Sequence, residues 1–570
     1  MPVRTSPSVR PQAEPPLPPQ TASRARLLER ILKRILPTLT SAVIAAAYVI
    51  ISPRSEDLAA HMLRAKLFSV EGWFGIWNNW WYAGHNLPGY SVLFPPAAAL
   101  TTPQLAAAIA CPISTFMFDA LVRRRYGEEA WLGALWFGVA TGTSLFTGRL
   151  TFAFGLMPAV GTALALQRRR PGLAVALGVL TALASPVDAL FAALAGAAYA
   201  VSEYLAADGP APATKRAGAT WPRLKGALPG VAVVIGSLAP VLALAVVFPE
   251  GGTEPFAFSA LWPIVVISVA ALLLIPRRDR ALRAGVALYA LGCIASYAVA
   301  SPIGSNATRL APLVAGPIVA LLWWPQPRSR RRTAALALLA LPLLYLQWQA
   351  PVRDLRTAND NREVTDAYFQ PLLSFLDRQP GPPFRIEIPF TLFHWEAFEV
   401  APRFALARGW ERQLDTKDNG LFYGSGPLTP AAYEAWLHQL AIRFVAVSDA
   451  EIDYSATAEV ALINHGLPYL HLVLHTRHWR VYEVTSATPI VQGAATLTAL
   501  GPNYMQLDAN RTGSAYIRVR WSPYWAVTEG DGCVAERGGF TTLTVRQPGP
   551  MRVAIRFSLG RIGASSPRCS

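Results

Sequence analysis

The polar residues with the clearest capacity for chemistry lie between residues 54 and 66, after the first apolar segment. This stretch opens with adjacent carboxylates, Glu56 and Asp57, and continues with His61 and Arg64. If Asp57 begins a short helix, His61 and Arg64 follow on the same face. A carboxylate in this setting suits a general base for a hydroxyl group or a metal ligand, with His61 and Arg64 beside a phosphate.

An aromatic run follows this stretch and supports a different interpretation. Its members are Trp73, Trp77, Trp80, Trp81 and Tyr82. Tryptophan and tyrosine gather where a membrane meets water. The alternative is therefore an interfacial helix whose acids face water and whose tryptophans form an aromatic belt.

Two further cations stand out because their surroundings contain few others. Arg149 and Arg309 lie in short connections between apolar segments. A guanidinium group suits bidentate contact with a phosphate. Either arginine could instead anchor a helix end by extending its charge to the membrane surface.

A dense aromatic and charged cluster lies in the last third of the chain. It comprises Trp395, Glu396, Arg408, Trp410 and Asp415. Aromatic faces flanked by carboxylates and arginine suit carbohydrate binding. The same residues could instead form an ion-pair network that holds this region against the rest of the protein.

The composition indicates a membrane protein. Hydrophobic residues make up 52% of the 570 residues and charged residues only 15%, whereas soluble proteins carry nearer a quarter. A net charge of +16 could indicate nucleic-acid binding. That function is excluded because the arginine runs stand at the ends of apolar segments, where the positive-inside bias explains them.

Apolar segments occupy most of the first 350 residues. A bilayer core requires about 20 apolar residues per helix. Eleven candidate spans centre near residues 43, 108, 138, 158, 178, 196, 237, 267, 291, 316 and 341. Basic runs fall in every second connection, at 123–125, 168–170, 215–225, 277–283 and 328–332. This alternation predicts a multi-pass plasma-membrane protein with a cytoplasmic N-terminus and an extracytoplasmic C-terminal segment.

The predicted fold class is a polytopic α-helical membrane protein followed by an extracytoplasmic α/β unit and a β-sandwich. We expect a flexible cytoplasmic tail at 1–34, a transmembrane domain at 35–349, an α/β domain at 350–487 and a β-sandwich module at 488–570. Cys533 and Cys569 both fall in the last module. A disulfide between them suits that compartment, unless the tail around Cys569 is disordered.

The layout of the first polar loop resembles that of the C-type (GT-C) membrane glycosyltransferases. The resemblance is carried by D-x-x-x-H-x-x-R from Asp57, W-x-x-W-W-Y-A-G at 77–84 and the prolines at 95–96. Within the superfamily, the chain is most similar to uncharacterised actinobacterial members described as 6-pyruvoyl-tetrahydropterin-synthase-related membrane proteins. Nothing in this sequence resembles a pterin enzyme. The C-terminal W-S-P-Y-W-A-V at 521–527 resembles the terminal β module of related transferases.

The resemblance implies an inverting transferase that takes a sugar from a polyprenyl-phosphate donor to a cell-envelope glycan or glycolipid. Asp57, with Glu56 beside it, would correspond to the acidic residue of the first outer loop. A divalent cation, Mg²⁺ or Mn²⁺, would bind at Asp57 if one is required. The alternatives are a transporter or lipid flippase, and a non-catalytic envelope assembly protein.

Overall fold

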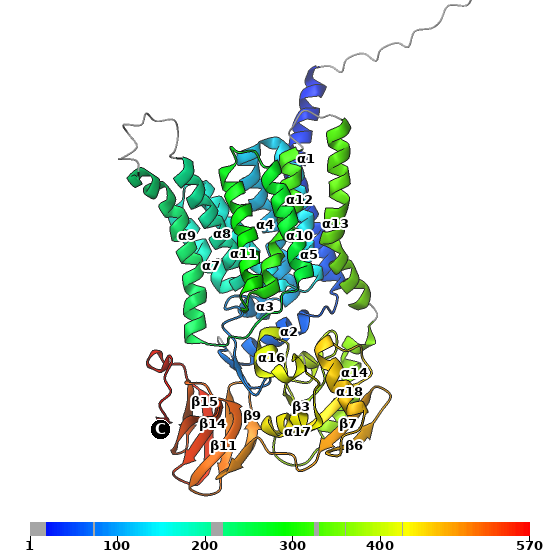
Figure 1. The fold of residues 1–570 in the computed structure, drawn as a ribbon, viewed down its shortest axis with the longest axis vertical. Coiled ribbons are helices and arrows are strands. Elements are labelled where there is room, and N and C mark those ends of the chain that lie inside the picture. Colours follow the sequence, from blue (N-terminus) through cyan, green and yellow to red (C-terminus); the bar gives the residue numbers. More distant parts are fainter. Residues whose placement is uncertain are drawn as a thin grey trace, which may run out of the picture.

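The computed structural model describes residues 19–71, 75–206, 220–323, 330–358, 361–424 and 426–569. The chain forms a bundle of long helices with a smaller C-terminal domain at one end (Figure 1). Short elements from the loop after the first helix lie between these two parts.

A helix occupies each of the eleven predicted centres. These helices are α1 (Pro19–Ile51), α4 (Pro103–Tyr126), α5 (Trp131–Phe146), α6 (Leu150–Gln167), α7 (Pro171–Ala184), α8 (Pro186–Ala206), α9 (Thr220–Val247), α10 (Phe258–Leu274), α11 (Arg280–Ala298), α12 (Leu310–Trp323) and α13 (Arg330–Ala358). Among the described residues, seven helices are long and apolar enough to cross a membrane, while α7 and α10 are shorter. A total of eleven spans therefore stays a prediction.

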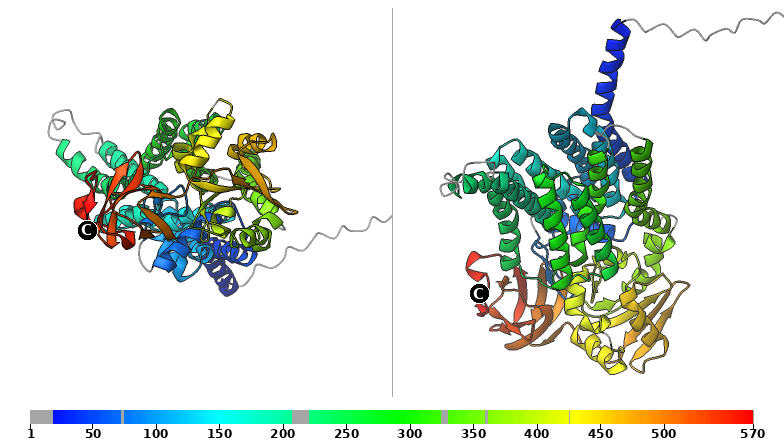
Figure 2. Two further views of the ribbon diagram at one scale, coloured as in Figure 1. Left: turned by 90° about the horizontal axis from the view of Figure 1, so that it is seen from below. Right: turned by 45° about the horizontal axis from the view of Figure 1, so that its top comes forward.

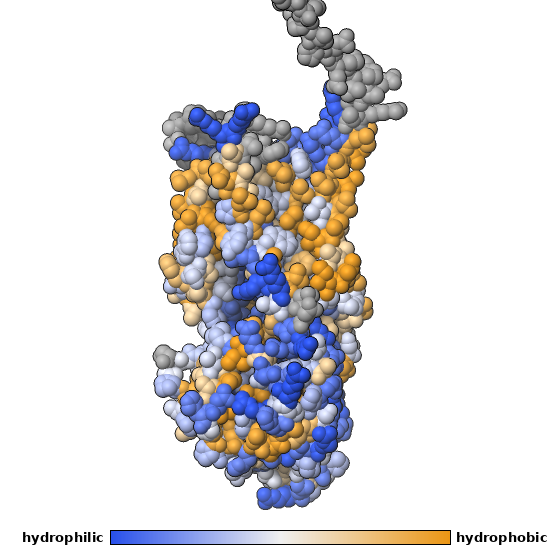
Figure 3. Space-filling view, turned by 90° about the vertical axis from the view of Figure 1, so that its right-hand side faces the viewer, coloured by the Kyte–Doolittle hydropathy of each residue, from blue (hydrophilic) through white to orange (hydrophobic). Residues whose placement is uncertain are grey.

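The outside of the bundle is apolar, as a lipid-facing surface must be. Large side chains such as Leu242, Leu273 and Leu341 are exposed there. On the face shown in Figure 3, apolar side chains predominate over the helical part, and hydrophilic ones gather at its far end and over much of the C-terminal domain. Because exposed leucine is unfavourable in water, this band fits a hydrocarbon environment.

The N-terminal boundary differs from the predicted one. Helix α1 begins at Pro19, so residues 19–34 continue the first helix instead of belonging to a flexible tail. The rest of the predicted tail lies outside the described residues. At the other end of the bundle, α13 continues to Ala358, past the predicted boundary at 350.

The loop after α1 lies at the junction of the two parts (Figure 2). It contains α2 (Leu58–Glu71), β1 (Trp77–Asn78), β2 (His85–Asn86) and α3 (Phe94–Leu100). Trp81 is fully buried and donates a hydrogen bond to the Ala397 carbonyl at 3.1 Å. The described aromatic residues therefore pack into the protein and do not form the interfacial belt of the alternative interpretation. Trp73 lies outside the described residues.

The first part of the C-terminal domain is an α/β unit. Its sheet has the order β4 (Ala405–Leu406), β3 (Arg385–Glu387), β5 (Ile442–Ser448), β7 (Trp479–Val484) and β6 (Leu470–His475). Strand β3 pairs in parallel with β4 and β5, whereas β5, β7 and β6 are antiparallel. Helices α14 (Asp366–Leu376), α15 (Glu396–Glu399), α16 (Arg412–Asp418), α17 (Pro430–Gln439) and α18 (Thr457–Asn464) complete the unit.

The second part is a sandwich of two antiparallel sheets. One sheet has the order β12 (Trp525–Glu529), β15 (Gly549–Ile555), β10 (Tyr504–Ala509) and β9 (Ala495–Leu500). The other has the order β16 (Arg568–Cys569), β13 (Gly532–Arg537), β14 (Phe540–Val545), β11 (Gly513–Arg520) and β8 (Val491–Gly493). Alternating apolar residues fill the space between the sheets. A disulfide joins Cys533 to Cys569 and fixes the end of the chain to β13.

Candidate functional site

Asp57 lies directly before α2, at the junction of the bundle and the C-terminal domain. The backbone turns at Ser55, whose carbonyl accepts a hydrogen bond from the Leu58 amide at 3.2 Å. The Asp57 side chain is half-buried, and its Oδ1 accepts a hydrogen bond from Trp410 Nε1 at 3.2 Å. A carboxylate at this position also benefits from the positive end of the α2 dipole. Asp57 is therefore held in place and remains accessible.

Glu56 differs electrostatically from its neighbour. Burial, followed by the negative charge of Asp57, raises the pKa of Glu56 to about 8, while the charge of Arg412 opposes this shift. The carboxyl group is therefore protonated at neutral pH. One negative charge, that of Asp57, remains at this point of the loop.

His61 does not provide a cation for a phosphate. Its ring is buried, with Nε2 3.1 Å from the Gly148 carbonyl oxygen and Nδ1 3.4 Å from Thr151 Oγ1. Burial, and next the charge of Arg64, lowers the pKa of His61 to about 3, so the ring is neutral. The contacts favour a positioning role, in which His61 fixes α2 to the start of α6.

Arg64 is likewise engaged with protein groups. Its guanidinium group forms an ion pair with Glu411 and lies 3.7 Å from the centre of the Tyr90 ring. The side chain is 4% exposed. The predicted contact of Arg64 with a phosphate is therefore not favoured, because its charge is already paired with the partly buried carboxylate of Glu411.

Gly148 brings Arg149 next to the Asp57 loop. At a φ of 73°, Gly148 packs so closely that a Cβ would lie 2.5 Å from Ser55 Oγ and 3.3 Å from Asp57 Cβ. Glycine is required here because it adopts this φ without strain and has no side chain to displace the loop. Arg149 follows at the start of α6, within electrostatic range of Asp57, Glu56 and Arg309.

Arg309 reaches the same region from another part of the bundle. It ends a 3-10 turn, Gly304–Arg309, directly before α12. Its guanidinium group lies 5.9 Å from the centre of the Phe152 ring, and its charge contributes to lowering the pKa of His61. Within the described residues, neither Arg149 nor Arg309 has a hydrogen-bond or ion-pair partner for its guanidinium group. Both charges are therefore available to an anion.

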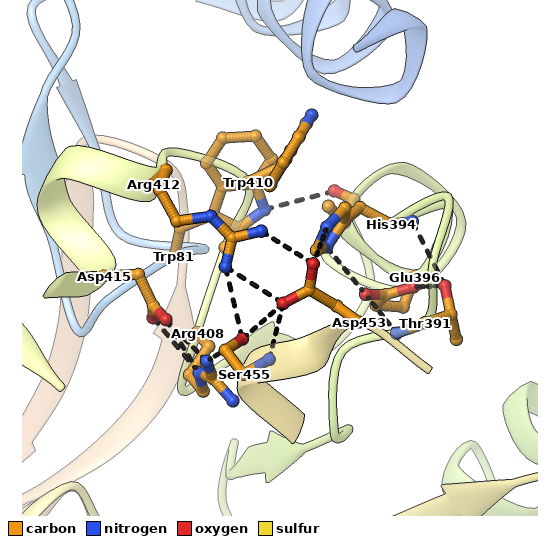
Figure 4. A network of polar contacts seen from close by, with 12 residues as sticks. Trp81, Thr391, His394, Glu396, Arg408, Trp410, Arg412, Asp415, Asp453 and Ser455 are labelled. Atoms are coloured by element: carbon orange, nitrogen blue, oxygen red, sulfur yellow. Dashed lines mark hydrogen bonds and ion pairs between the residues drawn. The ribbon is translucent and has the colours of Figure 1, made fainter. Parts of the chain in front are cut away.

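The predicted cluster in the C-terminal domain is mainly structural. Trp395, Glu396, Arg408 and Asp415 are all at most 2% exposed. Arg408 donates to Asp415 at 2.5 Å, and Glu396 accepts from the Thr391 hydroxyl at 2.6 Å (Figure 4). Arg408 also donates to Glu459 at 3.3 Å. Buried groups paired in this way cannot contact an acceptor glycan. The structural alternative is therefore favoured for these four residues.

Trp410 is the member of the cluster that faces the candidate site. It is half-buried, donates to Asp57 and stacks on His394 with ring centres 3.6 Å apart. His394 is buried between Glu396 and Asp453, with nitrogen–oxygen distances of 3.5 and 4.0 Å. Sequence reasoning did not single out His394 or Asp453, because no local pattern links them to Trp410.

A large cavity extends between the helices of the bundle, and none of Arg149, Arg309 and Asp57 is among its lining residues. Its volume is about 930 Å³, and its walls come mainly from α4, α6, α8, α11 and α12. Leu310 and Tyr289 line it near Arg309, and Arg125 and Arg169 line it at the opposite end of the helices. Most lining residues are apolar, so the cavity suits a long hydrocarbon chain.

A metal ion has little support from the residues present. Among the described residues, no group of three or more His, Cys, Asp or Glu side chains could hold one. The Mg²⁺ or Mn²⁺ at Asp57 stays a prediction, and no such group of ligands accompanies Asp57 among the described residues.

No protein-family model and no curated protein matches the chain. Among solved structures, it is similar to the arabinofuranosyltransferase AftD from mycobacteria, with 13% identity and a TM-score of 0.44. The match covers 93% of this chain and 59% of AftD, so the chain spans about three fifths of that protein. It is also similar to ArnT from Cupriavidus metallidurans, solved with bound undecaprenyl phosphate, with 15% identity and a TM-score of 0.36. That match covers 79% of this chain and 98% of ArnT. Neither comparison bears on the narrower resemblance to the actinobacterial membrane proteins.

Proposed function

We propose that the chain is a GT-C-type membrane glycosyltransferase. It would move a sugar from a polyprenyl-phosphate donor to a hydroxyl group of a cell-envelope glycan or glycolipid, on the membrane face that carries the C-terminal domain. The observation that carries the proposal is the convergence of an accessible carboxylate, Asp57, with two arginines, Arg149 and Arg309, that lack hydrogen-bond and ion-pair partners within the described residues. An apolar cavity, lined by Leu310, lies in the adjoining helices.

The arrangement matches the two ends of such a donor. A polyprenyl tail needs an apolar channel, and the cavity that starts at Leu310 offers one. The phosphate needs cations at the membrane surface, and Arg149 and Arg309 lie at the helix ends beside the Asp57 loop. Leu310, which follows Arg309 in sequence, is one of the residues that line the cavity.

The transfer step then follows from ordinary acid–base chemistry. Asp57 accepts the proton of the acceptor hydroxyl, and the hydroxyl oxygen attacks the anomeric carbon of the donor. The bond between that carbon and the phosphate oxygen breaks, and the polyprenyl phosphate leaves with its bonding electrons. Arg149 and Arg309 stabilise the negative charge that develops on the phosphate. A single displacement of this kind inverts the configuration at the anomeric carbon.

The test is transfer from a labelled polyprenyl-phosphate sugar by the full chain in membranes. We expect Asp57→Asn to lower the rate by about 10²–10⁴-fold, the typical contribution of a general base. Asp508→Asn is the matched control, because Asp508 is an exposed carboxylate on β10, in the sandwich. Equal rates for Asp57→Asn and the parent would contradict the assignment of Asp57 as the base.

A lipid flippase is the second candidate. The observation that favours it is the cavity, whose lining includes residues at both ends of the bundle. A fluorescent polyprenyl phosphate in vesicles distinguishes the two functions. A flippase would exchange the probe between leaflets without an acceptor, whereas the transferase would consume the donor only when an acceptor is present.

A further inference from the structure

The sandwich contacts the membrane part of the protein at the end of α9. The Tyr524 hydroxyl donates a hydrogen bond to the Val247 carbonyl at 2.7 Å. Phe248, Tyr524 and Phe557 form an aromatic cluster with ring centres 5.1–5.8 Å apart. The apolar span of α9 ends at Val247, so this cluster marks the level at which that helix leaves the membrane. Aromatic residues are enriched at this boundary.

An exposed apolar tip extends from this cluster. Phe557 is 48% exposed, and Leu559, in the 3-10 turn Leu559–Arg561, is 76% exposed. The segment lies beside the end of α9 in both orientations of the molecule (Figures 1 and 2). The Cys533–Cys569 disulfide and the hydrogen bond from Arg561 Nε to the Pro523 carbonyl hold the segment against the sandwich. Two large apolar side chains are thus fixed in an exposed position next to a membrane helix.

The tip is also strongly cationic. From residue 537 to the end, the sequence contains six arginines and no acidic residue. Burial, and then the charges of Arg561 and Arg556, lower the pKa of Arg568, which places three of these arginines close together. Arg556 is exposed, and its guanidinium group has no hydrogen-bond or ion-pair partner among the described residues. An anionic surface is the complementary partner.

We propose that the tip of Phe557, Leu559 and Arg556 rests in the adjoining membrane leaflet and binds anionic lipid headgroups. Leu559 and the exposed edge of Phe557 enter the interfacial layer, and Arg556 contacts headgroup phosphates. The sandwich is then held at two points, by α9 and by lipid. This second anchor fixes the height of the C-terminal domain above the bilayer.

The proposal is tested by photo-crosslinking with the full chain in nanodiscs. p-Benzoylphenylalanine replaces Leu559 in one protein and Leu472 in a matched control. Leu472 is 53% exposed on the edge strand β6, which lies far from the helices of the membrane bundle (Figure 1). We expect lipid adducts, detected by mass, from position 559 in phosphatidylglycerol nanodiscs and at most background adducts from position 472. Equal adduct levels at the two positions, or a crosslink from 559 to a second copy of the chain, would overturn the proposal.

The contribution of the Arg556 charge to lipid binding is tested with a separate variant. We expect Arg556→Glu to lower the adduct yield at 559 in phosphatidylglycerol by about fivefold or more, the effect of one basic side chain at an anionic surface. The same variant should leave the yield unchanged in phosphatidylcholine; an equal loss in both lipids would argue against headgroup binding.

Amide hydrogen exchange tests the same proposal on the chain without any substitution. Exchange of residues 556–562 should be slower in phosphatidylglycerol nanodiscs than in detergent, and equal exchange would also overturn the proposal.

Discussion

Under the proposed function, Arg149 and Arg309 are the residues we expect to bind the donor phosphate. Most other charged residues near Asp57 are engaged, as Arg64 is with Glu411. Leaving two cations without protein partners in a half-buried region is costly unless an anion binds them. The two arginines approach the Asp57 loop from separate helices, so an anion between them would also join α6 to α12.

We expect Arg309→Ala to raise the KM for the polyprenyl-phosphate donor by about tenfold or more, because a hydrogen bond to a charged group contributes about 1.5–3 kcal/mol. Arg511→Ala removes an exposed arginine in the sandwich and serves as the control. Steady-state kinetics with varied donor concentration provide the measurement. An unchanged KM for Arg309→Ala would remove this residue from the phosphate site.

Glu56 gives the site a defined response to pH. Its pKa of about 8 lies above its ordinary value of 4.5, so the native state binds this proton more tightly than the unfolded chain does. Its contribution to stability is therefore present below pH 4.5 and is lost as the pH rises through about 8. Above about pH 8, a second negative charge appears beside Asp57 and repels an incoming phosphate.

The expected result is a KM for the donor that rises above pH 8 in the parent protein and stays level in Glu56→Gln. Glutamine keeps the shape of the protonated acid and cannot ionise. The measurement is the donor KM between pH 6.5 and about 9, a range that brackets the Glu56 pKa. The same alkaline rise in Glu56→Gln would assign it to another group.

Among the elements, the segment that carries Trp410 couples the C-terminal domain to the loop before α2. Tyr82 donates hydrogen bonds to the carbonyls of Gly409 and Glu411, and Trp410 itself donates to Asp57. Behind Trp410, the Arg412–Asp453 ion pair at 2.8 Å and the stacked His394 ring fix the indole. The orientation of the candidate base therefore depends on the α/β unit.

We expect Trp410→Phe to lower the transfer rate by about tenfold, because one hydrogen bond to a charged group is lost while ring stacking on His394 remains. Trp436→Phe is the matched control, since its indole also donates one hydrogen bond, to Asn419 at 2.9 Å, within the same domain. Both variants should keep a melting temperature within a few degrees of the parent. Equal rates for the two variants would contradict a positioning role for Trp410.

At the level of the whole molecule, the Asp57 loop and the C-terminal domain share one hydrophobic core. That core includes Leu63 of α2, Trp81 of the junction, and Phe369 and Trp479 of the α/β unit. Because these residues pack together, the loop and the domain must occupy the same side of the membrane. The predicted orientation places that side outside the cell.

Reporter fusions after residue 570 test this orientation. We expect alkaline phosphatase to be active and green fluorescent protein to be dark at this position, because the arginine runs keep the opposite helix ends in the cytoplasm. A fusion in the connection at residues 207–219 should give the reverse pattern. A fluorescent C-terminal fusion would place the candidate site in the cytoplasm and contradict transfer on the outer face.

Local patterns were sufficient for the helices, and they singled out residues that the fold brings together at the candidate site, whose roles stay predictions. Long apolar segments bounded by arginine predict helices because lipid forces a chain to satisfy its backbone hydrogen bonds internally. Alternating residues such as those at 516–520 predict a strand with one buried face. Asp57, Arg149 and Arg309 were recognisable because charge is rare beside apolar segments.

The partners of these residues could not be predicted in the same way. Trp410 meets Asp57 across 353 residues of sequence, and Arg64 meets Glu411 across 347. Arg408 and Trp410 look alike as candidates in the sequence, yet one is buried in an ion-pair network and the other faces the site. Burial and pairing depend on which surfaces the folded chain brings together. Hydropathy and spacing record only neighbours along the chain, so they could not distinguish the residue that positions the base from those that stabilise the domain.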